Sequence, residues 1–181
     1  MGIWRTALRV LVGGLFIGHG TQKLFGWFGG EGLAKTEKSF AKLGLRPARE
    51  NAIAAGVTET AAGALLAAGA ATPLAASALT ATMLTAIDRV HARNGVWVTK
   101  GGYEYNAVLV AAIVEAGPGT LSIDAARDRE RHGMGWAIIA LSGGIFGAYV
   151  VDALSRRNAE GSASLAHAAA NAPEASSRQP A

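Results

Sequence analysis

Residues 59–88 read ETAAGALLAAGAATPLAASALTATMLTAID, and only the two end residues of this stretch, Glu59 and Asp88, are charged. The uncharged run between them is too long for one helix in the core of a soluble protein, and it fits two membrane-length helices joined near Pro73. Glu59 is also the one charged residue in the apolar stretch of residues 52–71. A carboxylate in hydrocarbon costs ~3 kcal/mol or more unless it is paired, so Glu59 is a candidate functional group.

The composition is typical of an integral membrane protein. The 181 residues are 50% hydrophobic and 17% charged, and the mean hydropathy is only +0.25 because alanine and glycine are abundant in the apolar segments. The net charge of +4 is spread over loops that flank these segments, which fits anionic lipid and argues against nucleic acid as a partner. The chain has no cysteine, so it has no thiol for a disulfide, a redox relay or an iron–sulfur cluster.

Five hydrophobic helices are predicted, and the first four form one membrane domain. Their expected ranges are 5–25, 51–69, 73–88, 103–117 and 133–154. We therefore expect an all-α fold in which residues 1–125 form a four-helix membrane bundle and residues 126–155 add a loop and a fifth transmembrane helix. Residues 156–181 have little to bury and are predicted to be a disordered polar tail.

Two further patterns concern packing. Residues 33–44 in the first loop place three lysines opposite a weakly apolar face, which fits either an interfacial helix on anionic headgroups or a solvated loop helix. Small residues also recur four positions apart on the helices, and such pairs allow helix backbones to approach closely, within one chain or between copies. These pairs are Gly14 with Gly18, Gly63 with Ala67, and Gly143 with Gly147.

The distribution of Lys and Arg predicts the orientation of the chain. With five spans, the first and third loops share a side with the C-terminal tail, and this side carries ten of these residues near the spans, against five on the other side. The positive-inside rule then places the C-terminus in the cytoplasm and the N-terminus outside the cell membrane. Aromatic residues at the two ends of the spans, among them Trp27, Trp97, Trp4 and Trp136, fit the interfacial belts of a membrane protein.

Polar side chains from four helices are expected to converge near the cytoplasmic face. With a rise of ~1.5 Å per residue, His19 and Glu59 are expected to lie at similar depth below the cytoplasmic ends of their helices. Lys23 is expected about one turn nearer the surface. The predicted intramembrane polar cluster comprises His19, Gln22, Lys23, Glu59, Asp88, Glu104 and Asn106. Two interpretations are open: a functional polar lining, or a structural arrangement in which Lys23 and Glu104 reach the interface and Glu59 pairs with His19 or a threonine hydroxyl.

The sequence contains no local motif for a metal centre, nucleophilic catalysis or a phosphate loop. His19, Glu59 and Glu104 could supply a nitrogen and two carboxylate oxygens to a metal ion. Their spacing nevertheless lacks the His-x-x-x-His or Glu-x-x-His pattern that places ligands on one helix face. We therefore expect neither a metal site nor a covalently bound cofactor.

Several short motifs, taken in order, carry a resemblance to a known family. They are Arg9, Gly13-Gly14 and Gly18-His19-Gly20 before Lys23; Phe40 with Leu43-Gly44-Leu45-Arg46-Pro47; Glu59 with Gly63, Leu65-Leu66 and Gly69; Gly101-Gly102-Tyr103-Glu104; and Gly117-Pro118-Gly119 through Asp124. Over residues 5–124 the chain resembles the DoxX family of bacterial membrane proteins. The predicted fifth helix and the tail lie outside this resemblance.

The resemblance implies a four-helix bundle in the bacterial cytoplasmic membrane with a link to quinone-dependent redox or oxidative-stress functions. On that basis we expect a membrane subunit or scaffold, and not an independent enzyme, that binds a quinone-like lipid at the polar cluster or holds redox partner proteins. Sulfur oxidation would require a partner with its own thiol or metal, since this chain has no cysteine. A small transporter or proton-conducting protein and a purely structural bundle, each as a monomer or a homo-oligomer, are the alternatives.

Overall fold

The computed structural model describes residues 2–117, 119, 121–128 and 134–171, and within these residues all regular structure is helical. The α-helices are α1 (Gly2–Phe25), α2 (Gly32–Lys42), α3 (Ala48–Ala68), α4 (Thr72–Ala86), α5 (Glu104–Ala116), α6 (Ile123–Ala126) and α7 (Met134–Ala170). The connections contain the 3-10 turns η1 (Trp27–Gly29), η3 (Ala92–Asn94) and η4 (Val98–Lys100) and the π-helical turn η2 (Ile87–His91). The prediction of an all-α fold is confirmed.

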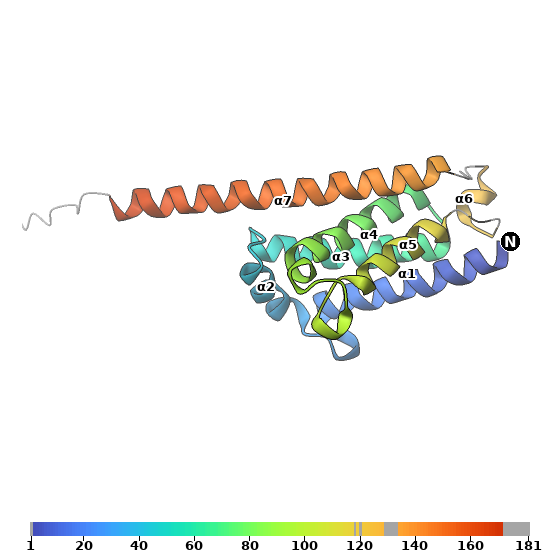
Figure 1. The fold of residues 1–181 in the computed structure, drawn as a ribbon, viewed down its shortest axis with the longest axis horizontal. Helices are drawn as coiled ribbons and strands as arrows, with labels where there is room; N and C mark the ends of the chain where they lie inside the picture. The colour runs from blue at the N-terminus through green and yellow to red at the C-terminus, as the bar shows by residue number, and fades with distance from the viewer. Residues whose placement is uncertain (1, 118, 120, 129–133, 172–181) are drawn as a thin grey trace, which may run out of the picture.

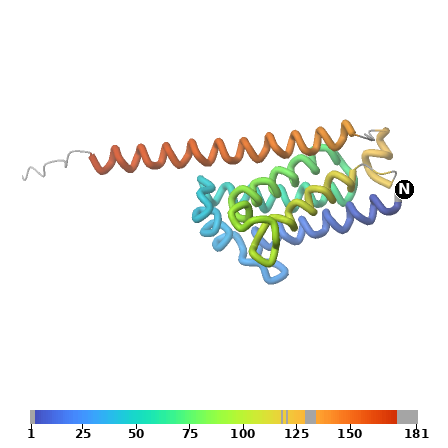
Figure 2. The backbone as a smooth tube through the Cα atoms, viewed as in Figure 1, coloured from blue at the N-terminus to red at the C-terminus, as the bar shows by residue number. Residues whose placement is uncertain are grey.

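Helices α1, α3, α4 and α5 lie side by side as a bundle, and α7 runs along α4 on the outside (Figures 1 and 2). Helix α2 packs against α1 and α3 at one end of the bundle. Helix α6 lies at the opposite end, near the N-terminus (Figure 1). We call these the α2 end and the α6 end.

The expected hairpin between the second and third predicted helices is present as α3 and α4. Gly69 ends α3 in a left-handed conformation, with φ of 64°, which glycine adopts at little steric cost. Pro73 lies in the first turn of α4, where its missing N–H removes no helical hydrogen bond. The two helices therefore reverse direction within three residues.

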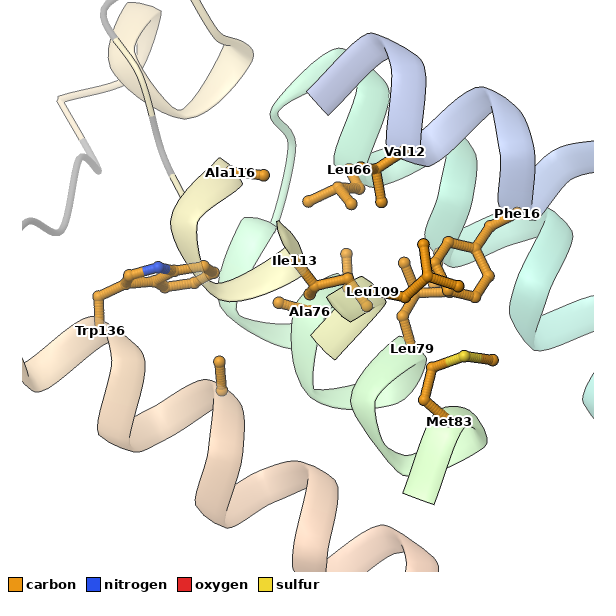
Figure 3. Packing of buried hydrophobic residues seen from close by; sticks show 13 residues of the cluster. Val12, Phe16, Leu66, Ala76, Leu79, Met83, Leu109, Ile113, Ala116 and Trp136 are labelled. Carbon is orange, nitrogen blue, oxygen red and sulfur yellow. The ribbon is translucent and has the colours of Figure 1, made fainter. Parts of the chain in front are cut away.

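Apolar side chains from all five long helices fill the centre (Figure 3). Phe16 of α1, Leu66 of α3, Leu79 of α4 and Ile113 of α5 are fully buried there. Helix α7 joins this core through Trp136, whose indole Nε1 also donates a 2.9 Å hydrogen bond to the carbonyl oxygen of Val114. The middle of the bundle is thus a continuous apolar core.

Glycines set the distance between α1 and α3. A Cβ added at Gly13 would collide with the carbonyl oxygen of Gly63, and one added at Gly63 would lie 2.7 Å from the carbonyl oxygen of Gly13. Nothing lies within 4 Å of the corresponding position at Gly14 or Gly18. The predicted Gly63–Ala67 pair therefore lies at a contact between α3 and α1, whereas the Gly14–Gly18 pair faces away from the bundle.

Helix α7 approaches α4 in the same way. A Cβ at Gly143 would lie 2.5 Å from the Ser77 hydroxyl oxygen, and one at Gly147 would lie 2.8 Å from Cβ of Ala81. The predicted Gly143–Gly147 pair is therefore a contact between the added helix and the bundle.

The C-terminal part of the chain differs from the prediction. Helix α7 continues to Ala170, so the expected end at Leu154 and the expected disorder from residue 156 were wrong for residues 156–170. This segment buries little, but it is rich in alanine, the residue with the highest intrinsic helix propensity, and it contains no proline before Pro173. Residues 172–181, also predicted to be disordered, lie outside the described residues, as does the predicted helix start at Gly133.

Of the helices in the described part of the chain, α7 is the one long and apolar enough to cross a membrane. Only 11% of its most apolar stretch is buried, and it exposes large side chains such as Ile138, Ile145 and Phe146. Helices α4 and α5 have 15 and 13 residues. Both are shorter than the ~20 residues that a hydrocarbon core of ~30 Å requires.

The α1–α3 packing predicts a difference between adjacent glycines. Gly13→Ala should destabilise the bundle by about 1–3 kcal/mol, because the added methyl group forces α1 and α3 apart. Gly14→Ala is the matched control and should be neutral or slightly stabilising, since its Cβ meets open space and alanine favours helix. Melting temperatures in mild detergent measure the difference, and equal values for the two variants would contradict the packing.

Candidate functional site

The polar centre at the α2 end is an ion pair between α1 and α3. The ammonium Nζ of Lys23 lies 2.6 Å from Oε2 of Glu59. The Glu59 side chain is 3% exposed, whereas that of Lys23 is 27% exposed. The carboxylate is therefore enclosed by the bundle, and the ammonium group covers it from the outside.

Close helix packing brings these two charges together. A Cβ at Gly20 would collide with the Thr60 hydroxyl and would lie 2.5 Å from the carbonyl oxygen of Gly56. The absence of side chains at Gly20 and Gly56 thus lets α1 and α3 approach beside Lys23 and Glu59. Lys23 then reaches Glu59 across the helix contact.

The two members of the pair differ in how they can be solvated. Lys23 has a flexible stem and a partly exposed ammonium group, so it can also reach water or lipid headgroups. The Glu59 carboxylate is buried and cannot reach water in this way, and burying an unpaired carboxylate costs free energy. Lys23 therefore supplies the counter-charge that makes burial of Glu59 tolerable.

Five of the seven residues in the predicted polar cluster do not join this pair. Gln22 donates to the Phe28 carbonyl oxygen at 3.3 Å, and Glu104 accepts from the Val98 backbone N–H at 2.8 Å. Asp88 is exposed and pairs with Arg89 at 3.3 Å, and Asn106 is buried with its Nδ2 3.5 Å from the Met83 sulfur. These four residues support loops and helix contacts and do not form one lining.

His19 has a different position. It is exposed, lies one helical turn before Lys23 on the same face of α1, and has no hydrogen-bonding partner among the described residues. The structure does not bring it to Glu59, and it leaves an imidazole and a partly exposed ammonium group adjacent on the outer surface of the bundle.

A metal centre finds no support in this arrangement. Within the described ranges, no three His, Asp or Glu side chains come together in a way that could hold a metal ion. His19, Glu59 and Glu104, the donors considered from the sequence, lie exposed, paired with Lys23 and bonded to a loop, respectively.

A second polar centre lies at the α6 end, and sequence reasoning missed it. Arg9 of α1 is fully buried, and its Nη2 donates a 2.5 Å hydrogen bond to the carbonyl oxygen of Leu121. Asp124 of α6 is also buried and accepts hydrogen bonds from Ala71 N, Thr72 N and Thr72 Oγ1, at 2.9, 2.9 and 2.7 Å. Asp124 thus caps the N-terminus of α4 from a segment about fifty residues away.

Glycines again provide the space for a charged side chain. A Cβ at Gly69 would lie 3.0 Å from Arg9 Cζ, and one at Gly119 would lie 2.9 Å from Arg9 Nη1. The backbone N–H of Asp124 also donates to the Gly69 carbonyl oxygen at 2.9 Å. The signal in the sequence is the position of Arg9, a charged residue inside the apolar first helix.

The environment of Asp124 favours its ionised form. Burial raises its pKa, but the hydrogen bonds from Thr72 and Ala71, together with the charge of Arg127, outweigh burial and hold the pKa of Asp124 below its ordinary value. The charged cap therefore contributes stability above the ordinary carboxyl pKa, and this contribution is lost as the pH falls through the lower folded-state value.

Comparison with known families identifies the segment that carries the α1–α3 pair. The model of the DoxX family matches residues 5–92. Residues 5–92 are a DoxX domain. No curated protein and no solved structure matches the chain.

The DoxX match is shorter than the resemblance drawn from the motifs, which extended to residue 124. It contains Arg9, Lys23 and Glu59, and it ends before α5, α6 and α7. Leu109 and Ile113 of α5 nevertheless pack into the same core as Val12 and Phe16 of the DoxX segment. The division between residues 1–125 and the segment that follows stays a prediction, whereas the boundary at residue 156 lies inside α7.

The Asp124 cap predicts a pH-dependent stability difference. Asp124→Asn should lower stability by about 1–2 kcal/mol at neutral pH, because it removes a charged helix cap. The difference from the unaltered protein should shrink as the pH falls below ~4, where the carboxyl group of the unfolded chain becomes protonated, and should vanish once the pH has fallen through the lower folded-state pKa of Asp124. Melting temperatures in detergent over a pH series measure this effect. The control is Asp128→Asn, an exposed carboxylate nearby, and a deficit that does not change with pH would refute a role for the Asp124 charge.

Proposed function

We propose that the protein is a multi-pass subunit or scaffold of the bacterial cytoplasmic membrane, and not an independent enzyme. In this proposal α1, α3, α4 and α5 form the membrane domain, and α7 is a fifth spanning helix. The DoxX domain and the apolar exposed surface of α7 support the membrane assignment. The helices shorter than a bilayer, α4 and α5, lie inside this bundle beside longer neighbours.

The site proposed to act is the outer surface of α1 around His19 and Lys23, with Glu59 behind them. This arrangement fits the head of a quinone-like lipid, which supplies carbonyl oxygens and proton-coupled redox chemistry. His19 has ring nitrogens without a partner among the described residues, and Lys23 has N–H donors beyond the one bonded to Glu59. Histidine and a buried carboxylate are also suited to holding and releasing protons near a ligand. The exposed, unpartnered imidazole beside Lys23 is the observation that carries the proposal.

Proton conduction or transport receives less support. The polar centres Lys23–Glu59 and Arg9–Asp124 lie toward opposite ends of the bundle, and apolar side chains such as Val12, Phe16 and Leu66 pack between them (Figure 3). A conducting path needs polar groups or water across this region. We therefore favour binding at the surface of the bundle, in association with a redox partner protein or a second copy of the chain.

The proposed orientation places the α2 end, the extension of α7 and the C-terminus in the cytoplasm. Arg89 of η2, beside the α2 end, is ion-paired to Asp152 of α7, and Asp152 also pairs with Arg156 at 2.8 Å. Charged side chains therefore begin at Asp152 on a helix that is uncharged from Met134 to Val151.

Reporter fusions after Arg157 test this orientation. A reporter that is active in the cytoplasm is expected to work at this position, and activity of a periplasmic reporter would contradict the proposed topology.

The ligand proposal predicts that charge and proton exchange matter beyond packing. His19→Ala and Glu59→Gln should lower the amount of quinone that copurifies from membranes in mild detergent, because each removes a donor or a titrating group from the site. Mass spectrometry of extracted lipids, normalised to protein, measures this amount. His167→Ala is a matched control on the exposed extension of α7. If both site variants accumulate to normal protein levels and retain their quinone content, the Lys23–Glu59 pair has only a structural role and the ligand proposal is wrong.

A further inference from the structure

An open cavity of about 460 Å³ lies at the α2 end, between α2, the start of α3 and the extension of α7. We call it the basic cavity because Lys38, Arg46 and Arg49 line it. Asn158 and Ser162 line it from α7, and Asn158 Nδ2 donates a 3.2 Å hydrogen bond to the Arg46 carbonyl oxygen. One wall of the cavity therefore comes from the part of α7 that continues as a helix past the bundle, and Figure 1 shows this continuation.

The charges around the basic cavity leave an excess of cations. Its two carboxylates are those of Glu37 and Glu50. Glu37 pairs with Arg49 at 3.4 Å, so these two charges offset each other. Lys38 and Arg46 have no ion-pair partner within the described residues, which leaves two cations facing one carboxylate. The free N–H donors of these cations suit a phosphate oxygen.

The height of the basic cavity matches lipid headgroups in the proposed membrane placement. Asp152 is the first charged residue after the uncharged part of α7, and Asn158 follows it six residues later. At ~1.5 Å per residue this places Asn158 about 9 Å beyond the apolar stretch. The headgroup region on each side of a bilayer is on the order of 5–8 Å thick, so Asn158 lies near its outer edge.

We propose that the basic cavity binds the phosphate group of an anionic phospholipid in the cytoplasmic leaflet. Lys38 and Arg46 supply the charge, and Asn158 fixes the extension of α7 so that the third wall is in place. A lipid held there bridges the DoxX domain and α7, which contact each other elsewhere through helix packing and the Arg89–Asp152 pair. The inference rests on the membrane placement proposed above and is independent of the quinone site.

The first test compares two double substitutions of equal charge. Lys38→Gln with Arg46→Gln removes cations of the basic cavity, and Lys35→Gln with Lys42→Gln removes exposed lysines of α2 that do not line it. Native mass spectrometry in detergent is used to titrate each protein with phosphatidylglycerol and with phosphatidylcholine. We expect phosphatidylglycerol to bind more tightly than phosphatidylcholine to the unaltered protein, and the cavity variant to lose about tenfold in this affinity, with little change in the control. Equal losses in both variants would show diffuse surface attraction and overturn the site.

The second test introduces a negative charge without removing a cation. Asn158→Asp places a carboxylate at the basic cavity, whereas Ser164→Asp places one on the same exposed helix outside it. Only Asn158→Asp should weaken phosphatidylglycerol binding, because its carboxylate repels the lipid phosphate and cannot donate the hydrogen bond that Asn158 gives to the Arg46 carbonyl oxygen. Circular dichroism checks that both variants retain their helices, so that an effect of misfolding is recognised.

A competition experiment distinguishes a bound phospholipid from a soluble phosphate compound. Inorganic phosphate is added to the unaltered protein carrying phosphatidylglycerol, and the lipid is expected to stay bound. Displacement by inorganic phosphate at millimolar concentration would assign the basic cavity to a soluble phosphate compound and overturn the lipid proposal. Copurified quinone is measured in the Asn158→Asp variant as well, and it should be unchanged, which distinguishes a failure of this site from a failure of the proposed quinone site.

Discussion

The close contact between α1 and α3 is the constraint on which the rest of this structure depends. Gly13 with Gly63, and Gly20 with Gly56, allow the two backbones to meet without intervening side chains. At this separation, Lys23 reaches Glu59 at 2.6 Å. A wider gap would leave the Glu59 carboxylate enclosed by apolar groups without its counter-charge. Burying an unpaired charge in this way is energetically costly. Packing and electrostatics therefore select the same arrangement.

The buried charged side chains of the described residues, Arg9, Glu59 and Asp124, lie toward the two ends of the bundle. At the α2 end Lys23 covers Glu59, and at the α6 end Asp124 caps α4 while Arg9 holds the Leu121 carbonyl oxygen. The centre is filled by apolar side chains (Figure 3). The two ends therefore differ in chemistry from the apolar core that separates them.

The sequence predicted the helices, and it placed Lys23 and Glu59 in one polar cluster with five other residues, for simple physical reasons. Long uncharged runs indicate where helices lie, and the rise per residue gives the depth of a charge along each helix. Rotation about the helix axis was not predictable, because α3 and α4 are rich in alanine on every side and carry no amphipathic pattern that assigns a face. Because only depth could be predicted, Asp88, Glu104 and Asn106 were also expected to belong to the polar cluster.

The buried position of Arg9 was missed because its partner segment lies more than a hundred residues away. The extension of α7 was missed because low burial was given more weight than helix propensity.

Helix α7 is held by the bundle along its length and not merely connected to it. Trp136 bonds to α5 near the α6 end, Gly143, Gly144 and Gly147 fit against α4, and Asp152 pairs with Arg89 near the α2 end. Three separate contacts along one straight helix fix its rotation as well as its position. A helix fixed in this way projects its continuation in a defined direction, which is why Asn158 meets the Arg46 carbonyl oxygen. The extension is therefore held in place by contacts made within the apolar part of α7 together with the single hydrogen bond of Asn158, although little else packs against the extension itself.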